Sequence, residues 1–240
     1  MSDSSRGVWY MALATFIFGL MTVFVKLVPA IPALEIIFFR ALVAVVLSYW
    51  GIKRARVSIW GHNKGMLILR GVAGVTALSL NFWLIQEIPL AAASTLTYLA
   101  PISTTIIGIW FVKEKVSPLQ FLFFAISFSG ILVIQGFDAR ISLLHLGVGL
   151  VTCLFMGLAY NCVRKLSTSE HPLVIILYFP LVCLPITGLW SLLFWVQPEG
   201  LEWFYLFMVG ITSQVAQYFM TRSYQLAEIS TVSIVNYTGI

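Results

Sequence analysis

GVAGVTALSLNFWLIQEIPLAAASTLTYLAPISTTIIGIWFV is the sequence from Gly71 to Val112. Two apolar segments of about 20 residues each are joined here by the turn at residues 86–89, which ends in proline. An α-helix rises about 1.5 Å per residue, so each segment matches the roughly 30 Å hydrocarbon core of a bilayer. The stretch therefore predicts two consecutive membrane-spanning helices.

The same pattern returns 136 positions later in the chain. The second copy has Gly210, Thr212, Leu226, Ala227, Ser230 and Thr231 where the first has Gly74, Thr76, Leu90, Ala91, Ser94 and Thr95. In the same register Gln217-Tyr218-Phe219 stands opposite Asn81-Phe82-Trp83. A repeat of this kind predicts that the protein is built from two related halves.

Composition extends the membrane interpretation to the whole chain. Of its 240 residues 60% are hydrophobic and only 10% are charged, whereas a soluble domain carries about 25% charged residues. The apolar runs are continuous, unlike the short alternating strands of a membrane β-barrel, so we predict an all-α polytopic membrane protein. The predicted spans are 8–28, 32–50, 66–86, 90–112, 118–137, 144–165, 172–196, 201–222 and 228–240.

The net charge of +5 raises the question of a nucleic-acid partner. In a membrane protein, cytoplasmic loops collect Lys and Arg, so we predict a lipid bilayer as the surroundings and no nucleic acid. The three cysteines lie in apolar runs, which argues against a disulfide framework or a metal site. No phosphate-binding glycine loop, HExxH or GxSxG is present. We therefore predict no cofactor, no metal, no catalytic residues and no enzymatic activity.

The loops predict the orientation. With a cytoplasmic N-terminus the outer segments hold only Arg140, and the inner segments hold ten cations: Arg6, Lys53, Arg54, Arg56, Lys64, Lys113, Lys115, Arg164, Lys165 and Arg222. This is a strong positive-inside signal. Five spans in the first unit then make the second unit enter from the opposite face, as an inverted-topology repeat with a site near the midplane. We predict repeats at 1–140 and 141–240, the second truncated about 12 residues into the ninth span.

Two spans carry matching stripes of small, polar and cationic residues. Thr15, Gly19, Thr22 and Lys26 share a face of the first span, and Cys153, Gly157, Tyr160 and Arg164 share a face of the sixth. One interpretation makes these stripes the walls of a cavity. The other makes the glycines close-packing sites and lets the cations reach the membrane interface.

A longer polar stripe lies in the eighth span, where Gln214, Gln217, Tyr218, Thr221 and Gln225 share a face. Amides in hydrocarbon need polar partners or water, so this face predicts a cavity lining. Asn81 in the third span corresponds to Gln217. The fourth span adds Ser94, Thr97, Tyr98, Thr104 and Thr105.

The second span contains Glu35 near its start and Arg40 deeper in. An arginine at that depth costs at least a few kcal/mol unless it is paired or hydrated, so it must face the bundle interior. Five residues along a helix rotate by roughly 140°, so we expect each of the two to find a partner on another helix. Locking the span in place and contacting substrate are both open roles for Arg40.

Three stretches carry a resemblance to a known family: EIIFFR (35–40), PLAAASTLTYLAPISTTIIGIWFVKEK (89–115) and QFLFFAISFSGILVIQG (120–136). Together they resemble the EamA-type proteins of the drug/metabolite transporter superfamily. The resemblance implies ten helices in two inverted repeats, a central cavity, no nucleotide hydrolysis, and transport of a small metabolite such as an amino acid or organic ion, with export favoured.

The sequence thus predicts a secondary transporter for a small polar or charged molecule in the cell membrane; the alternative is a non-transporting scaffold or receptor-like bundle. A homodimer is left open. The candidate residues of the substrate cavity are Thr15, Gly19, Thr22, Lys26, Arg40, Asn81, Tyr98, Gly157, Tyr160, Gln214, Gln217 and Tyr218.

Overall fold

The computed structural model describes residues 3–113, 117–119, 121–122, 124–126, 129, 142–228, 231–232 and 235. No strand occurs in this part of the chain, and its helices are α1 (Asp3–Lys26), α2 (Ala33–Ala55), α3 (Lys64–Glu87), α4 (Leu90–Thr97), α5 (Ala100–Phe111), α7 (Leu143–Leu166), α8 (Pro172–Leu193) and α9 (Glu202–Leu226). Six stretches, with α4 and α5 counted as one, are long and apolar enough to cross a membrane. The prediction of a helical membrane protein is confirmed for these residues.

The helix ends follow local signals in the sequence. Pro172 is the first residue of α8, where its missing N–H costs nothing. Ser142 caps α7 by accepting the N–H of His145, whose ring accepts the N–H of Ser142 in return. Such signals explain why the predicted spans agree with the observed helices to within a few residues. The predicted spans 118–137 and 228–240 lie mostly outside the described residues.

The stretch Leu90–Phe111 is long and apolar enough to be the single span predicted at 90–112, but within it the helix breaks after Thr97 and restarts at Ala100. Pro101 has no N–H to donate to the carbonyl of Thr97. The thiol of Cys153 in α7 reaches this break, with its Sγ atom 3.3 Å from the carbonyl oxygen of Leu96 and 3.9 Å from that of Thr97. Helix α8, by contrast, continues through its two internal prolines.

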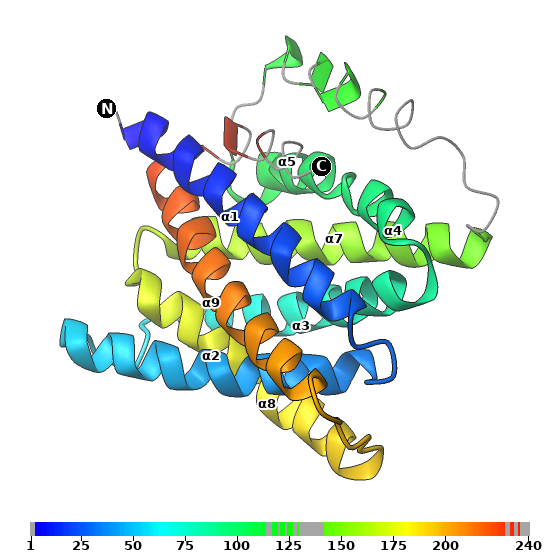
Figure 1. The fold of residues 1–240 in the computed structure, drawn as a ribbon. Helices are drawn as coiled ribbons and strands as arrows, with labels where there is room; N and C mark the ends of the chain where they lie inside the picture. The colour runs from blue at the N-terminus through cyan, green and yellow to red at the C-terminus, as the bar shows by residue number, and fades with distance from the viewer. Residues whose placement is uncertain are drawn as a thin grey trace.

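The helices pack in reciprocal pairs. Helix α1 lies along α9, and α7 packs in the same way against α3. Helix α2 packs against α8. In addition, α2 contacts α9, and α8 contacts α3 in the corresponding way. Figure 1 shows α1 and α9 side by side, running diagonally across the front of the bundle. Each helix thus has its main contacts in the other half of the chain.

Two glycines allow close approach at two of these helix crossings. A Cβ atom built on Gly71 would lie 2.6 Å from Cγ2 of Val182, and one built on Gly210 would lie 2.6 Å from Cβ of Val43. Only glycine permits this approach. Both glycines and both valines are separated by 139 positions, so packing matches Gly210 with Gly71. The repeat spacing of 136, which matched Gly210 with Gly74, does not apply at these crossings.

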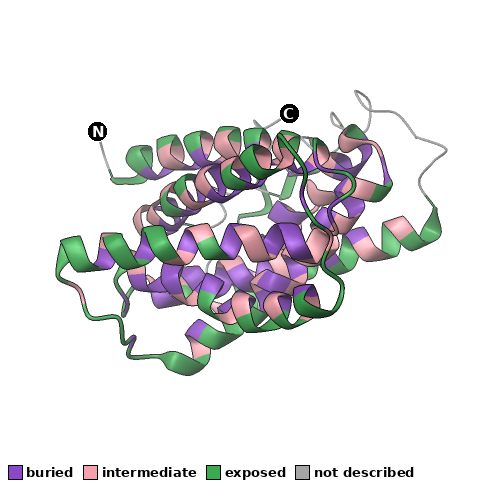
Figure 2. Cartoon of the chain, turned by 60° about the horizontal axis from the view of Figure 1, so that its bottom comes forward, coloured by how far each residue is buried: buried purple, intermediate pink, exposed green. Residues whose placement is uncertain are grey.

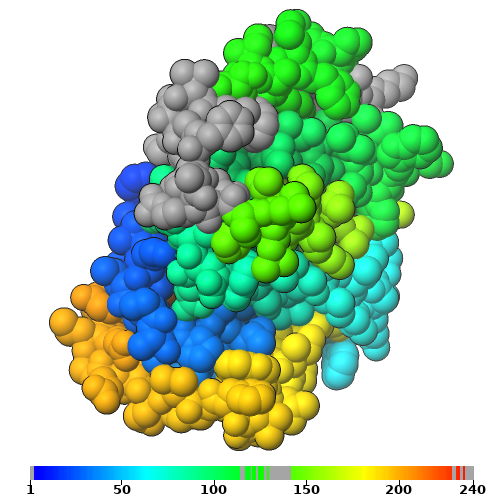
Figure 3. Space-filling model, turned by 90° about the vertical axis from the view of Figure 1, so that its right-hand side faces the viewer, coloured from blue at the N-terminus to red at the C-terminus, as the bar shows by residue number. Residues whose placement is uncertain are grey.

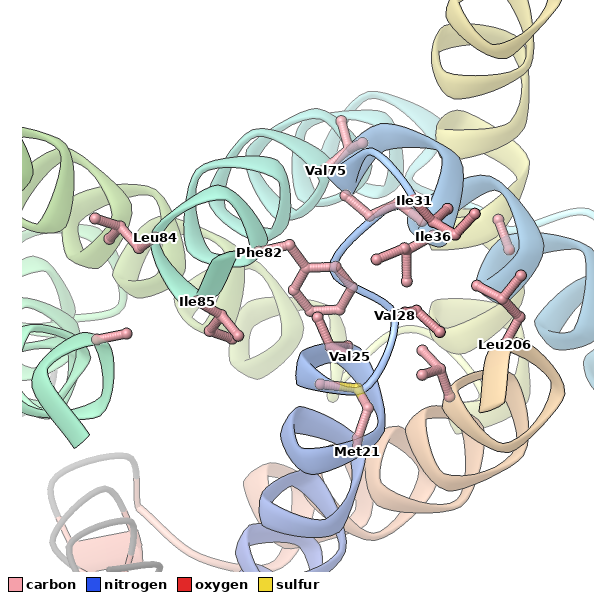
Figure 4. Packing of buried hydrophobic residues seen from close by; sticks show 14 of the residues in the cluster. Met21, Val25, Val28, Ile31, Ile36, Val75, Phe82, Leu84, Ile85 and Leu206 are labelled. Carbon is pink, nitrogen blue, oxygen red and sulfur yellow. The ribbon is translucent and has the colours of Figure 1, made fainter. Parts of the chain in front are cut away.

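Burial divides the helices into inward and outward faces, as Figure 2 shows. The largest buried cluster joins the end of α1, the start of α2, and parts of α3 and α9 (Figure 4). Large apolar side chains on the outside, such as Trp9, Trp110 and Leu192, are 68%, 82% and 83% exposed. An apolar exterior over a packed core is the arrangement that a bilayer favours.

Candidate functional site

A cavity of about 210 Å³ lies inside the bundle. Every described helix contributes to its wall, and most of the contributing residues lie near the middle of their helices. The break between α4 and α5 brings Thr97, Tyr98 and Pro101 to the same space. Pocket and helix break therefore coincide, as they do where irregular backbone lines a membrane cavity.

Seven of the residues that the sequence singled out come together on this wall. They are Thr15, Thr22, Arg40, Asn81, Tyr98, Tyr160 and Gln217. They belong to both halves of the chain and to five helices plus the α4–α5 break.

The other candidates lie elsewhere. Tyr218 is 41% exposed and Gln214 donates to Oγ of Ser48, so the predicted stripe on α9 divides and only Gln217 faces the cavity. A Cβ built on Gly19 would meet no described atom within 4 Å. Gly157 packs against the backbone of α5, where a Cβ would lie 3.0 Å from the Thr104 nitrogen. These four residues do not line the described cavity.

Lys26 is also outside the cavity wall, and it has a structural role. Its Nζ atom lies 2.6 Å from the carbonyl oxygen of Ile85 and 3.2 Å from that of Ile88, at the C-terminal end of α3. Arg164 in the second half does the same for α9, with Nη1 2.9 Å from the carbonyl oxygen of Tyr224. Both cations satisfy carbonyls that helix ends leave unpaired.

Arg70 on α3 lines the cavity but was not among the sequence candidates. The sequence contained a pattern that points to Arg70. It shares one helix face with the candidate Asn81, because Arg70, Gly74, Ala77 and Asn81 stand at i, i+4, i+7 and i+11. Its position near the cytoplasmic end of the predicted span made it resemble an ordinary loop cation. The tertiary structure shows that only 3% of its surface is exposed.

The two cavity arginines meet at one aromatic ring. The guanidinium carbon of Arg40 lies 5.0 Å from the ring centroid of Phe179, and that of Arg70 lies 4.3 Å from it. Cations held over an aromatic face are stabilised by the ring quadrupole, more so when water is excluded. Gly74 makes room for this arrangement, because a Cβ there would lie 2.7 Å from the Phe179 ring.

Neither arginine has an acidic partner in the part of the chain that the structure describes. The ion pairs there are Arg6 with Asp3 and His62 with Glu170. Arg40 donates from Nε to Oγ of Ser213. Glu35 does not pair with Arg40 but accepts the Val196 N–H at 3.0 Å, in the connection after α8 and not on another helix as expected.

Several nitrogen donors in the cavity remain without hydrogen-bond partners among the described residues. They are Nη1 of Arg40, Nε and Nη1 of Arg70, and Nε2 of Gln217. No acidic residue of the described chain lines the cavity. The site is therefore electropositive and rich in donors.

Beside its polar groups the wall also has apolar, adaptable side chains. Four methionines, Met11, Met21, Met156 and Met220, line it together with Phe18 and Leu78. Unbranched, polarizable methionines accommodate ligands of varied shape. The cavity thus combines a cationic, hydrogen-bonding side with a soft apolar one.

The sequence resembles transporters along nearly its whole length. It is 31% identical over 241 residues to the pseudopaline exporter CntI of Pseudomonas aeruginosa, covering 98% of this chain and 84% of that one. It is 26% identical to human solute carrier family 35 member G1, covering 95% of this chain and 67% of the relative. A riboflavin transporter of Vibrio cholerae is 27% identical over 79% of this chain and 64% of its own length.

The fold has a solved counterpart as well. A crystal structure superimposes with a TM-score of 0.80 at 16% identity, covering 99% of this chain and 84% of that chain. At that identity the likeness concerns the fold alone. Residues 5–136 match the model of the EamA-like transporter family. With more than half of its length matched, the chain belongs to the EamA-like transporter family.

Proposed function

We propose that this protein is a secondary transporter that exports a small polar or charged metabolite across the cytoplasmic membrane by alternating access. The observation that carries the proposal is the interior cavity, whose wall combines polar side chains from both halves of the chain. A scaffold or receptor-like bundle has no need of a polar space at this depth. Export is favoured because the relative that is 31% identical is named as an exporter.

We further propose that the two halves are inverted repeats that move against each other. The reciprocal helix pairs support this, since α1 packs on α9 as α7 packs on α3. The contacts of Gly71 with Val182 and of Gly210 with Val43 support it at residue level. Rocking of one repeat against the other around a central site is the usual mechanism for such folds.

Two carboxylates are suited to control the ends of the bundle. Glu35 at the start of α2 accepts the N–H of Val196, which follows α8. Glu170, just before α8, accepts the N–H of Asn63, which precedes α3, at 2.7 Å. Each bond joins one half of the chain to the other, at opposite ends of α8. We propose that each of these two hydrogen bonds breaks when the bundle opens at the end where that bond lies.

Figure 3 views the end of the bundle at which α2 begins and α8 ends. There the segment between α1 and α2 (blue) lies beside the α8–α9 connection (yellow). We propose that this end faces outward and that the N-terminus is cytoplasmic. The positive-inside distribution supports this orientation.

Labelling of single-cysteine variants tests the orientation. Ser58→Cys lies in the α2–α3 connection and Gln197→Cys in the α8–α9 connection, and both positions are exposed. The three native cysteines are buried, so they contribute little background. In intact cells an impermeant maleimide must label Gln197→Cys and spare Ser58→Cys until the cells are permeabilised. The reverse pattern would overturn the orientation.

Comparison of metabolites inside and outside cells tests transport. Cells that produce the protein should accumulate at least one small metabolite outside, relative to cells with the empty vector. The control variant Arg54→Ala removes an exposed cation that lies over Trp50, outside the cavity, and should export like the wild type. Identical metabolite profiles for protein-producing and empty-vector cells would count against transport and favour the scaffold.

A further inference from the structure

We propose that the transported molecule is an organic anion whose carboxylate or phosphate group binds between Arg40 and Arg70 at the face of Phe179. This inference rests on the proposed function and names the chemistry of its substrate. It follows from the charge, the unpaired donors and the apolar wall of the cavity, taken in turn.

No acidic residue among those that the structure describes compensates the charge of the site. Arg40 and Arg70 are 4% and 3% exposed, and no described acidic residue forms an ion pair with either. Buried charges are costly unless they are paired, and the two cations also repel each other. An arrangement of this cost is retained where it serves function, and a bound anion would neutralise it.

The buried unpaired groups on the cavity wall are all hydrogen-bond donors. Nη1 of Arg40, Nε and Nη1 of Arg70, and Nε2 of Gln217 are N–H donors. A guanidinium presents parallel N–H bonds that match the two oxygens of a carboxylate or phosphate. An ammonium group has no acceptor and would leave these donors unsatisfied. The donor set thus selects an oxyanion.

The arginines are held in place before any ligand arrives. Nε of Arg40 bonds to Ser213, which leaves Nη1 for a ligand. Both guanidinium groups lie over Phe179, and Gly74 gives that ring its space. Preorganised donors lose little entropy on binding, so this rigidity favours affinity.

The remaining wall indicates an organic anion in preference to an inorganic one. Met11, Met21, Met156 and Met220 line the same cavity as the two arginines. Chloride, sulfate or inorganic phosphate would leave these side chains without a partner. An anion with a carbon skeleton fills both sides of a cavity of about 210 Å³.

Thermal unfolding of the purified protein in detergent tests the inference. The probes are succinate, citrate and glutamate as organic anions, sulfate and chloride as inorganic anions, and choline as a cation, all at matched ionic strength. At least one organic anion should raise the midpoint by about 4 °C or more, as saturating binding does. Sulfate and chloride should act weakly, and choline should have no effect.

Three variants separate a binding site from a structural one. Arg70→Met should unfold at a higher temperature than the wild type without ligand, because an apolar side chain of similar volume removes an unpaired buried charge. Arg70→Met and Arg40→Lys should each weaken the response to anions by about tenfold or more. Arg54→Ala should respond like the wild type. An Arg70→Met protein that unfolds below the wild type would indicate a structural role.

The outcomes distinguish this inference from the proposed function. If no organic anion stabilises the wild type more than it stabilises the double variant Arg40→Lys/Arg70→Met, the anion inference is wrong. Export of a cation or neutral metabolite that survives in the double variant would also overturn it, yet leave transport intact. Stabilisation by an anion with no export of any metabolite would support anion binding and contradict transport.

Discussion

Arg40 and Phe179 occupy the same position in two helices that pack against each other: each is the eighth residue, of α2 and α8 respectively. The guanidinium carbon of Arg40 lies 5.0 Å from the centre of the Phe179 ring. A cation from one half of the chain therefore meets an aromatic ring from the other. The two halves are alike in packing but differ in chemistry where they meet.

The first prediction concerns Arg40. Arg40→Ala should reduce export per folded molecule by about 100-fold, because it removes a charge-assisted contact with the substrate. Arg40→Lys should retain part of the activity, since charge survives while the planar fork is lost. Export is measured against the amount of folded protein determined by size-exclusion chromatography. Normal export by well-folded Arg40→Ala would exclude a functional role.

The second prediction tests a helix crossing. Gly71→Ala should destabilise the protein by about 1–3 kcal/mol, because its Cβ would overlap Val182. Val182→Ala in the same chain should restore part of that loss, whereas Val43→Ala should not. The double-mutant cycle is read from thermal unfolding in detergent. Equal effects of the two valine changes would show that the Gly71–Val182 contact does not control this crossing.

The third prediction concerns Lys26, which binds carbonyls at the end of α3. Lys26→Met keeps the length of the side chain and leaves those carbonyls without their donor, which should cost about 1–3 kcal/mol of stability. Lys53→Met is the matched control, because Lys53 is exposed over the ring of Tyr49. A loss of export at unchanged stability would instead indicate that Lys26 contacts the substrate.

The fourth prediction is a pH dependence at His171, which precedes α8 and accepts the N–H of Leu173. Partial burial, followed by the charge of Arg222, lowers the pKa of His171 below its usual 6.5. Below that pH the unfolded chain binds a proton that the folded protein resists, so this residue should reduce stability as pH falls from 7.5 to 5.5. His171→Asn keeps a capping acceptor without titrating and should flatten the slope. Parallel pH profiles for the two proteins would refute this assignment.

The spans were predictable because their cause is local. A helix in lipid satisfies its own backbone hydrogen bonds, so length and continuous apolar character define it without reference to neighbours. The same holds for Pro172 and Ser142 at helix starts. The deeply placed Arg40 was recognisable for an equally local reason, since a charge at that depth must turn inward.

Other features depend on contacts between distant segments. Gln217 and Tyr218 are neighbours in the sequence and about 100° apart on the helix, yet one lines the cavity and the other is 41% exposed. Periodicity places residues on a face, but the helices packed around α9 decide which part of that face is enclosed. For the same reason the sequence did not identify Arg70. Its position in the chain resembles that of a loop cation, and only the packing of the helices around it shows that it is buried.

Helical membrane architecture, a polar interior and an arginine that must face inward all follow from the amino-acid sequence, because hydropathy and helical period act within one segment. The matching of Gly71 with Gly210 and the meeting of Arg40, Arg70 and Phe179 arise from tertiary structure. Each depends on which helix lies opposite, and close packing of side chains from the other half of the chain sets that arrangement.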